Sequence, residues 1–127
     1  MKNSIFSIAV ILLFLVFSAC NKEEPQQVSA LFTTNLQSNT MTAGAGVTIY
    51  TSEATGEFLT YFIGIDSTTT FGTGFGTNIE LGTDSLVLNY YDEGTYTFTL
   101  VASSYGNWGE TVNQDVQSVD INVVVAE

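Results

Sequence analysis

The stretch that most constrains the fold runs from Thr95 to Ala102, where small hydroxyl residues alternate with large apolar ones. The hydroxyl residues are Thr95, Thr97 and Thr99, and the apolar residues between them are Tyr96, Phe98 and Leu100. Because successive side chains of a β-strand point to opposite faces, one face of this stretch is expected in a core and the other toward solvent. The Asp-Glu-Gly run at residues 92–94 predicts a turn directly before the strand.

Further β-type runs recur along the chain and are separated by glycine-containing segments. They cover residues 30–34, 47–51, 58–66, 85–91 and 119–125. After residue 19, no stretch has the i, i+3, i+4, i+7 spacing of an amphipathic helix. The pattern predicts an all-β protein, an antiparallel β-sandwich of about seven strands.

Alternation within these runs also predicts which side chains face the core. In residues 58–66 the expected core face is Leu59, Tyr61, Ile63 and Ile65. In residues 85–91 it is Leu86, Leu88 and Tyr90. Val116 precedes the last run but is out of phase with Val119, so a strand extended back to Val116 would need a β-bulge.

The first 19 residues have the pattern of a secretory signal peptide. A short polar start with one lysine is followed by the apolar run 5–17, which is short for a membrane span. The sequence Phe17-Ser18-Ala19-Cys20 resembles a bacterial lipobox, in which Cys20 is lipidated and becomes the first mature residue. The alternative is a single membrane-anchor helix. We expect a signal peptide at residues 1–19, a lipidated tether at 20–29 and a domain at 30–127.

The residues after Cys20 add an expectation about location. Lys22-Glu23-Glu24 resembles the export tag of surface-displayed lipoproteins in some gram-negative bacteria. The alternative is a polar tether without an address. The resemblance implies an outer-membrane lipoprotein, held in the membrane through its N-terminal lipid and exposed at the cell surface.

Charge excludes one class of partner. The chain has a formal net charge of −11, and removal of residues 1–19 leaves Lys22 as the one cation against 13 acidic residues. Such a surface repels nucleic acid and lacks the basic patch that nucleic-acid binding requires. It also favours a soluble, monomeric domain. Because Cys20 is the only cysteine, an intrachain disulfide is ruled out.

The strand after the turn resembles one family in particular. Tyr90, Gly94, Tyr96, Phe98 and Leu100 match the pattern of PKD-type domains, which are immunoglobulin-like sandwiches common in extracellular proteins. The resemblance implies such a sandwich over residues 30–126. The spacing of Asp92, Gly94 and Tyr96 is also that of a tyrosine corner, in which the tyrosine hydroxyl bonds to backbone near the turn. The family's tryptophan on the third strand is Ile63 here, and residues 64–67 replace its Gly-Asp-Gly turn.

The residue types needed for most catalysis are missing. There is no histidine, which removes nucleophilic triads with a histidine base and zinc sites of the His type. Residues 72–76 are glycine-rich, but no helix pattern or lysine follows them, so we expect a turn rather than a phosphate loop. We predict a protein that is not an enzyme and has no cofactor. Calcium binding by loop carboxylates stays open, although no Asp-x-Asp-x-Asp-Gly run exists.

One loop is the best candidate for binding. Residues 104–109 lie between the last two predicted strands and contain Tyr105, Asn107 and Trp108, the only tryptophan. Amphipathic aromatic rings suit sugar faces and protein anchors, and loops at the ends of a sandwich are common binding sites. The alternative is that Trp108 folds back over the core. Phe71 and Phe75 in the Gly/Thr-rich loop allow the same two interpretations.

Together these expectations describe a non-enzymatic cell-surface lipoprotein that serves in adhesion or binds a polysaccharide or an outer-membrane protein. The alternative is a structural spacer or accessory subunit of an outer-membrane complex that has no ligand of its own.

Overall fold

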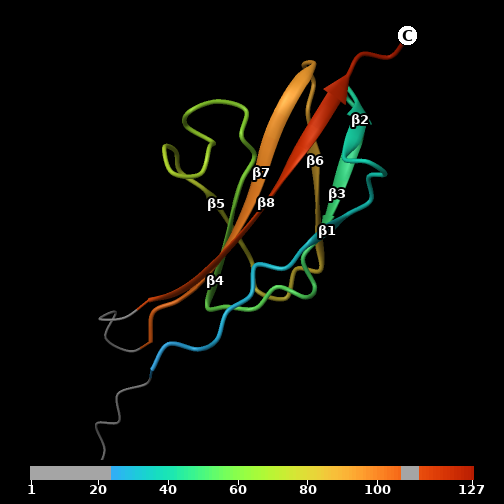
Figure 1. Cartoon of the computed structure of the whole chain (residues 1–127). Helices are drawn as coiled ribbons and strands as arrows, with labels where there is room; N and C mark the ends of the chain where they lie inside the picture. The colour runs from blue at the N-terminus through green and yellow to red at the C-terminus, as the bar shows by residue number, and fades with distance from the viewer. Residues whose placement is uncertain (1–23, 107–111) are drawn as a thin grey trace, which may run out of the picture.

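The computed structural model describes residues 24–106 and 112–127, and all regular elements within them are strands (Figure 1). There are eight: β1 (Thr33–Thr34), β2 (Thr40–Thr42), β3 (Gly46–Tyr50), β4 (Phe58–Phe62), β5 (Thr77–Ile79), β6 (Ser85–Asn89), β7 (Gly94–Ser104) and β8 (Asn113–Val124). The predicted all-β class is therefore confirmed, with β2 and β5 as short strands that the sequence pattern did not indicate.

The strands form two sheets. One has three strands in the order β1-β3-β6, and the other has five in the order β2-β8-β7-β4-β5. The pairs are antiparallel except β2 and β8, which run parallel. The longest pairing joins β7 to β8, with Gly94 opposite Val123 at one end and Ser104 opposite Asn113 at the other.

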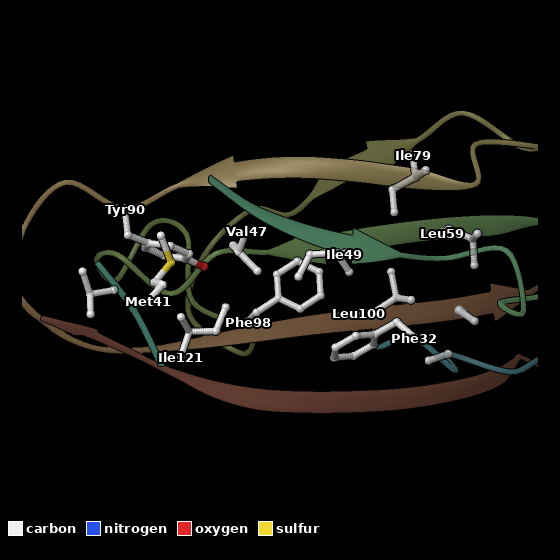
Figure 2. Close-up of a cluster of buried hydrophobic side chains, with 13 residues drawn as sticks. Phe32, Met41, Val47, Ile49, Leu59, Ile79, Tyr90, Phe98, Leu100 and Ile121 are labelled. Carbon is white, nitrogen blue, oxygen red and sulfur yellow. The ribbon is translucent and has the colours of Figure 1, made fainter. Parts of the chain in front are cut away.

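The core lies between the sheets and is centred on Phe98, which is fully buried. Its ring packs edge-on against Phe32, with centroids 5.0 Å apart, and stacks on Tyr61 at 6.1 Å. Figure 2 shows Val47 and Ile49 of β3 facing Phe98 and Leu100 of β7. The apolar residues of the alternating stretch 95–102 thus form the centre of the core. On its other face Thr95 and Thr97 are exposed, as expected, but Thr99 is buried rather than turned toward solvent.

Two tyrosines close one end of the core at the turn before β7. The buried Tyr90 donates its hydroxyl to the carbonyl of Ile63 at 3.0 Å, and Tyr96 donates its own to the carbonyl of Asp92 at 3.0 Å. Their rings stack with centroids 4.8 Å apart. Gly94 has φ +152°, a conformation almost confined to glycine, which lets the chain pass directly from the turn into β7.

Two detailed expectations from the sequence are wrong. Ile65 is 50% exposed rather than in the core, because β4 ends at Phe62 and Gly64 turns the chain away with φ +70°. A Cβ at Gly64 would collide with the backbone of Thr97, so glycine is needed there. Val116 needs no bulge: it pairs with Val101 in a continuous register and lies on the outer face of the sheet.

The segment before residue 30 is part of the fold. The Asn113 side-chain amide donates to the carbonyls of Pro25 and Gln26, at 3.1 and 2.8 Å. The amide of Gln26 donates to the Ser104 hydroxyl, and that of Ala30 donates to the carboxylate of Asp115. Contacts with the domain therefore reach back to Pro25, into the region expected to be a tether.

Candidate functional site

Of the loop residues predicted to bind, the structure describes Tyr105, which directly follows β7. Its side chain is 42% exposed. Asn107 and Trp108, like Cys20, lie outside the described residues.

Tyr105 belongs to an exposed aromatic pair. Phe58, the first residue of β4, lies opposite Ser103 of β7, which places its ring beside the end of that strand. The rings of Phe58 and Tyr105 meet edge to face, with centroids 5.8 Å apart and an interplanar angle of 72°. Phe58 is 52% exposed, so the two rings present one amphipathic surface to solvent.

A carboxylate holds this pair in place. The backbone amide of Tyr105 donates to Oε2 of Glu57 at 2.9 Å. This hydrogen bond, together with one from the Ser104 side chain, lowers the pKa of Glu57 below its ordinary value. The charged form is favoured because each donor stabilises the carboxylate. Glu57 therefore fixes the start of the loop and places a negative charge at the rim of the aromatic pair.

The aromatic pair continues into the outer face of the five-stranded sheet. We define this outer face by the residues that alternate with the core residues where β4, β7 and β8 lie side by side. They are Phe58, Thr60 and Phe62 of β4, Thr99, Val101 and Ser103 of β7, and Gln114, Val116 and Ser118 of β8. None of these side chains is charged, although the molecule is strongly acidic, and the strip ends at Asp120, the next residue of β8 on this face, which accepts a bond from the Thr97 hydroxyl at 2.7 Å. A neutral strip with apolar and hydroxyl groups thus runs across this part of the sheet. Its β7 residues Thr99, Val101 and Ser103 are buried, so the accessible groups of the strip come from β4 and β8.

The connection from β4 to β5 extends the aromatic surface at the other end of β4. Phe71 packs edge-on against Phe62 of the outer face, with centroids 5.2 Å apart. The loop is shaped by Asp66, whose Oδ1 accepts bonds from the hydroxyl and the amide of Thr68 at 2.6 and 2.8 Å. These bonds lower the pKa of Asp66, so the turn is best held when its carboxylate is ionised. The loop is a folded structure that displays aromatic rings.

Other types of site find little support in the described part of the chain. No three acidic side chains in residues 24–106 and 112–127 come close enough together to hold a metal ion. A hollow of about 330 Å³ at one end of the sandwich has Asp84 as the one acid among its described lining residues, so no carboxylate pair converges there. The same two ranges contain no helix long and apolar enough to cross a membrane.

Comparisons with known proteins add no assignment. No protein-family model matches the chain, and no curated protein matches it in sequence. The site must therefore be interpreted from its own geometry.

The sequence indicated Tyr105 but not its partner Phe58. A signal was present, because Phe58 and Phe62 occupy the solvent-facing positions of an alternating strand, where threonine or charged residues are usual. What the sequence could not supply was the register between β4 and β7, which brings Phe58 to the loop. The residues Tyr90, Gly94, Tyr96 and Phe98 lie in the corner and the core, away from this surface.

Proposed function

We propose that the protein is a non-enzymatic lipoprotein of the cell surface, whose β-sandwich binds a neutral glycan or a protein partner through the Phe58–Tyr105 pair and the adjoining outer face. Lipidation at Cys20 rests on the lipobox-like sequence 17–20. Surface display rests on the short motif Lys22-Glu23-Glu24.

The strand order supports an immunoglobulin-like sandwich of the PKD type. In that architecture one sheet contains strands A, B and E, and the other contains G, F and C. Here β1, β3 and β6 occur in the order A-B-E, while β8, β7 and β4 occur in the order G-F-C. The bond from Tyr96 to the Asp92 carbonyl, two residues before Phe98, has the form of a tyrosine corner.

One observation supports binding above all, the exposure of two packed aromatic rings beside an uncharged strip. Scattered exposed apolar residues are common, but an ordered pair continuous with a neutral sheet face is typical of a recognition surface. The charge of the molecule limits which classes of ligand this surface can bind. With Glu57 at the rim and a net charge of −11, an anionic glycan or lipid headgroup would be repelled. A neutral sugar face or an uncharged protein surface fits.

A titration tests the binding function. We expect the fluorescence of Trp108 to change on addition of a neutral polysaccharide or a detergent extract of outer membranes. We expect Phe58→Ser and Tyr105→Ser each to lower the affinity obtained from that titration by about tenfold. Tyr50→Ser is the matched control, since Tyr50 has similar exposure on the other sheet. A flat response to every polysaccharide and extract would contradict the binding function and favour the spacer.

The lipid is tested separately. The wild-type protein is expected in the detergent phase of a Triton X-114 separation, and Cys20→Ala is expected to stay in its unprocessed form without added lipid. Incorporation of labelled fatty acid into both proteins distinguishes acylation from a membrane-anchor helix, since the helix would retain the protein in detergent without the label. Equal labelling of Cys20→Ala would overturn this part of the proposal.

A further inference from the structure

The three-stranded sheet ends in an open edge at β6. This strand pairs with β3 on one side, and no strand in residues 24–106 or 112–127 follows it in the sheet order β1-β3-β6. The bond from the Thr51 amide to the Asp84 carbonyl fixes the alternation of the ladder, so Leu86 and Leu88 bond to β3. The amides and carbonyls of Ser85, Val87 and Asn89 then point outward. They form no hydrogen bond with any described residue.

A small apolar hollow lies beside this edge. It measures about 110 Å³ and is lined by residues of both sheets and of the β4–β5 loop, among them Tyr61, Ile63, Phe75, Thr77 and Leu88. Ile63 and Leu88 pack against the core cluster but are only partly buried, because none of the described strands closes the sandwich on this side. The hollow has the size of an aliphatic side chain and lies next to a row of free backbone groups.

Phe75 stands at the mouth of the hollow. Its side chain is 91% exposed, the largest exposed fraction of any large apolar residue in the described chain. Its backbone is nevertheless held, since its amide donates to the carbonyl of Thr68 at 2.8 Å. An ordered loop that holds a phenylalanine in solvent, beside a hollow and a free strand edge, is a feature that a partner would cover.

The charge around β6 identifies the kind of partner. Glu80 and Asp84 precede the strand, and Asp92 and Glu93 follow it. The chain's two lysines, Lys2 and Lys22, both fall outside the described residues, so no described side chain neutralises these acids. A second copy of this chain is a poor occupant. Antiparallel pairing of two β6 strands would bring the acids before one strand against the acids after the other, at a like-charge cost.

We propose that β6 accepts an extended segment of another polypeptide, in which apolar residues alternate with polar ones and lysine or arginine residues flank the run. The segment adds a fourth strand to the sheet and satisfies the outward groups of Ser85, Val87 and Asn89. One of its apolar side chains enters the 110 Å³ hollow under Phe75. Main-chain bonds supply affinity and the hollow supplies specificity, as in other cases of strand addition. This surface is separate from the Phe58–Tyr105 pair and does not depend on the function proposed for it.

The test uses purified full-length protein in detergent and a synthetic peptide of alternating threonine and valine with two lysines at each end. A peptide with glutamates in place of the lysines and a scrambled peptide are the controls. We expect the lysine peptide to bind, with protection of the Ser85, Val87 and Asn89 amides from hydrogen exchange. We expect the affinity of the glutamate peptide to be at least about tenfold lower. We expect added salt to lower the affinity of the lysine peptide.

Two variants locate the surface. Val87→Pro removes an outward amide while leaving the ladder to β3 intact, and it is expected to abolish binding, whereas Val87→Thr keeps the amide and binding. Phe75→Ser is expected to weaken binding by about tenfold, whereas Tyr91→Ser, at a similarly exposed position, has no effect. If Val87→Pro fails to fold, the Phe75→Ser variant and the comparison of the lysine and glutamate peptides still test the proposal. No protection at β6, equal binding of both charged peptides, or self-association through β6 in sedimentation would overturn it.

Discussion

Tyr90 and Tyr96 occupy the same corner but meet different demands. Tyr90 is buried, and its hydroxyl is satisfied by the carbonyl of Ile63, which comes from the segment after β4. Tyr96 is only partly covered, and its hydroxyl bonds to the carbonyl of Asp92 within its own turn. The first tyrosine ties two segments 27 residues apart, and the second fixes the local geometry of the turn.

Removal of the Tyr96 hydroxyl tests its contribution. Tyr96→Phe keeps the stacking on Tyr90 but loses the bond to Asp92, so we expect the free energy of unfolding to fall by about 1 kcal/mol. Urea denaturation measures it. Tyr91→Phe is the control, because Tyr91 is exposed and its hydroxyl forms no hydrogen bond with a described residue. An unchanged midpoint for Tyr96→Phe would mean that the bond contributes nothing to the fold.

The buried Tyr90 makes stability depend on pH at the alkaline end. Burial, with a smaller effect of the neighbouring Tyr96, raises the pKa of Tyr90 well above its ordinary value near 10. In the unfolded chain the phenol ionises near pH 10, so the unfolded state is increasingly favoured above that pH. We expect the ionisation of this one group in the unfolded chain to lower the free energy of unfolding by about 1 kcal/mol at pH 11.

The measurement compares urea denaturation at pH 8 and pH 11 for the wild type and Tyr90→Phe. The variant starts from a lower stability because it lacks the bond to Ile63, but it is expected to lose less between the two pH values. Equal losses in the two proteins would show that Tyr90 ionises as freely in the fold as in the unfolded chain.

At the level of the elements, long and alternating strands were predictable and short ones were not. Strand β7 extends the alternating stretch 95–102 by one residue at its start and two at its end, because the alternation spans nearly the whole strand. Strands β2 and β5 have three residues each, too few for a pattern, and they exist because neighbouring strands lie beside them. Strand β8 begins at Asn113, six residues before the predicted start, because pairing with β7 overrides its mixed polar sequence.

The same limit applies to the candidate site: its local features were predictable from the sequence and its long-range ones were not. The loop containing Tyr105 was indicated by its composition, whereas the partner Phe58 and the edge at β6 follow from strand register and sheet order. Both are long-range properties, which local periodicity does not determine. The exposed Phe75 was visible in the sequence as an aromatic residue in a Gly/Thr-rich loop, but its relation to the hollow beside Leu88 was not.

The N-terminal segment offers a test at this scale. Asn113→Ala removes the two bonds to the carbonyls of Pro25 and Gln26, and we expect the Gln26 amide to exchange its hydrogen faster, while the Ala30 amide, held by Asp115, stays protected. Hydrogen-exchange NMR measures both amides. Gln114→Ala is the neighbouring control, since its side chain makes no bond to a described residue. Unchanged exchange at Gln26 would mean that the segment is held without Asn113.

For the whole molecule, the dominant property is charge of one sign. The described residues contain no lysine or arginine, so their acids repel one another with no salt bridge among them to offset the effect. Added salt therefore screens repulsion and has no attraction between described residues to weaken. This differs from a domain of mixed charge, in which the two effects of salt oppose each other.

We therefore expect the unfolding temperature to rise between low salt and about 0.5 M NaCl, where the Debye length has fallen well below 10 Å. Differential scanning calorimetry at neutral pH measures the shift. A triple variant with Glu53, Glu80 and Glu93 changed to Gln carries less charge and should respond less to the same salt. A fall in unfolding temperature on adding salt would contradict the account.

The hydrogen bonds from Asn113 to the carbonyls of Pro25 and Gln26 limit how far the domain can stand from a membrane. With Cys20 carrying the lipid, as proposed, five residues reach Pro25 and span at most about 17 Å. The end of the sandwich that holds Tyr105 is the end where the N-terminal segment enters (Figure 1), while the Asp92 turn lies at the opposite end of the β7–β8 pair, about 35 Å away along the strands. The aromatic pair would meet a neighbour at the level of the bilayer. The hollow beside Leu88 would face a partner arriving from outside, so that one small domain could join the two.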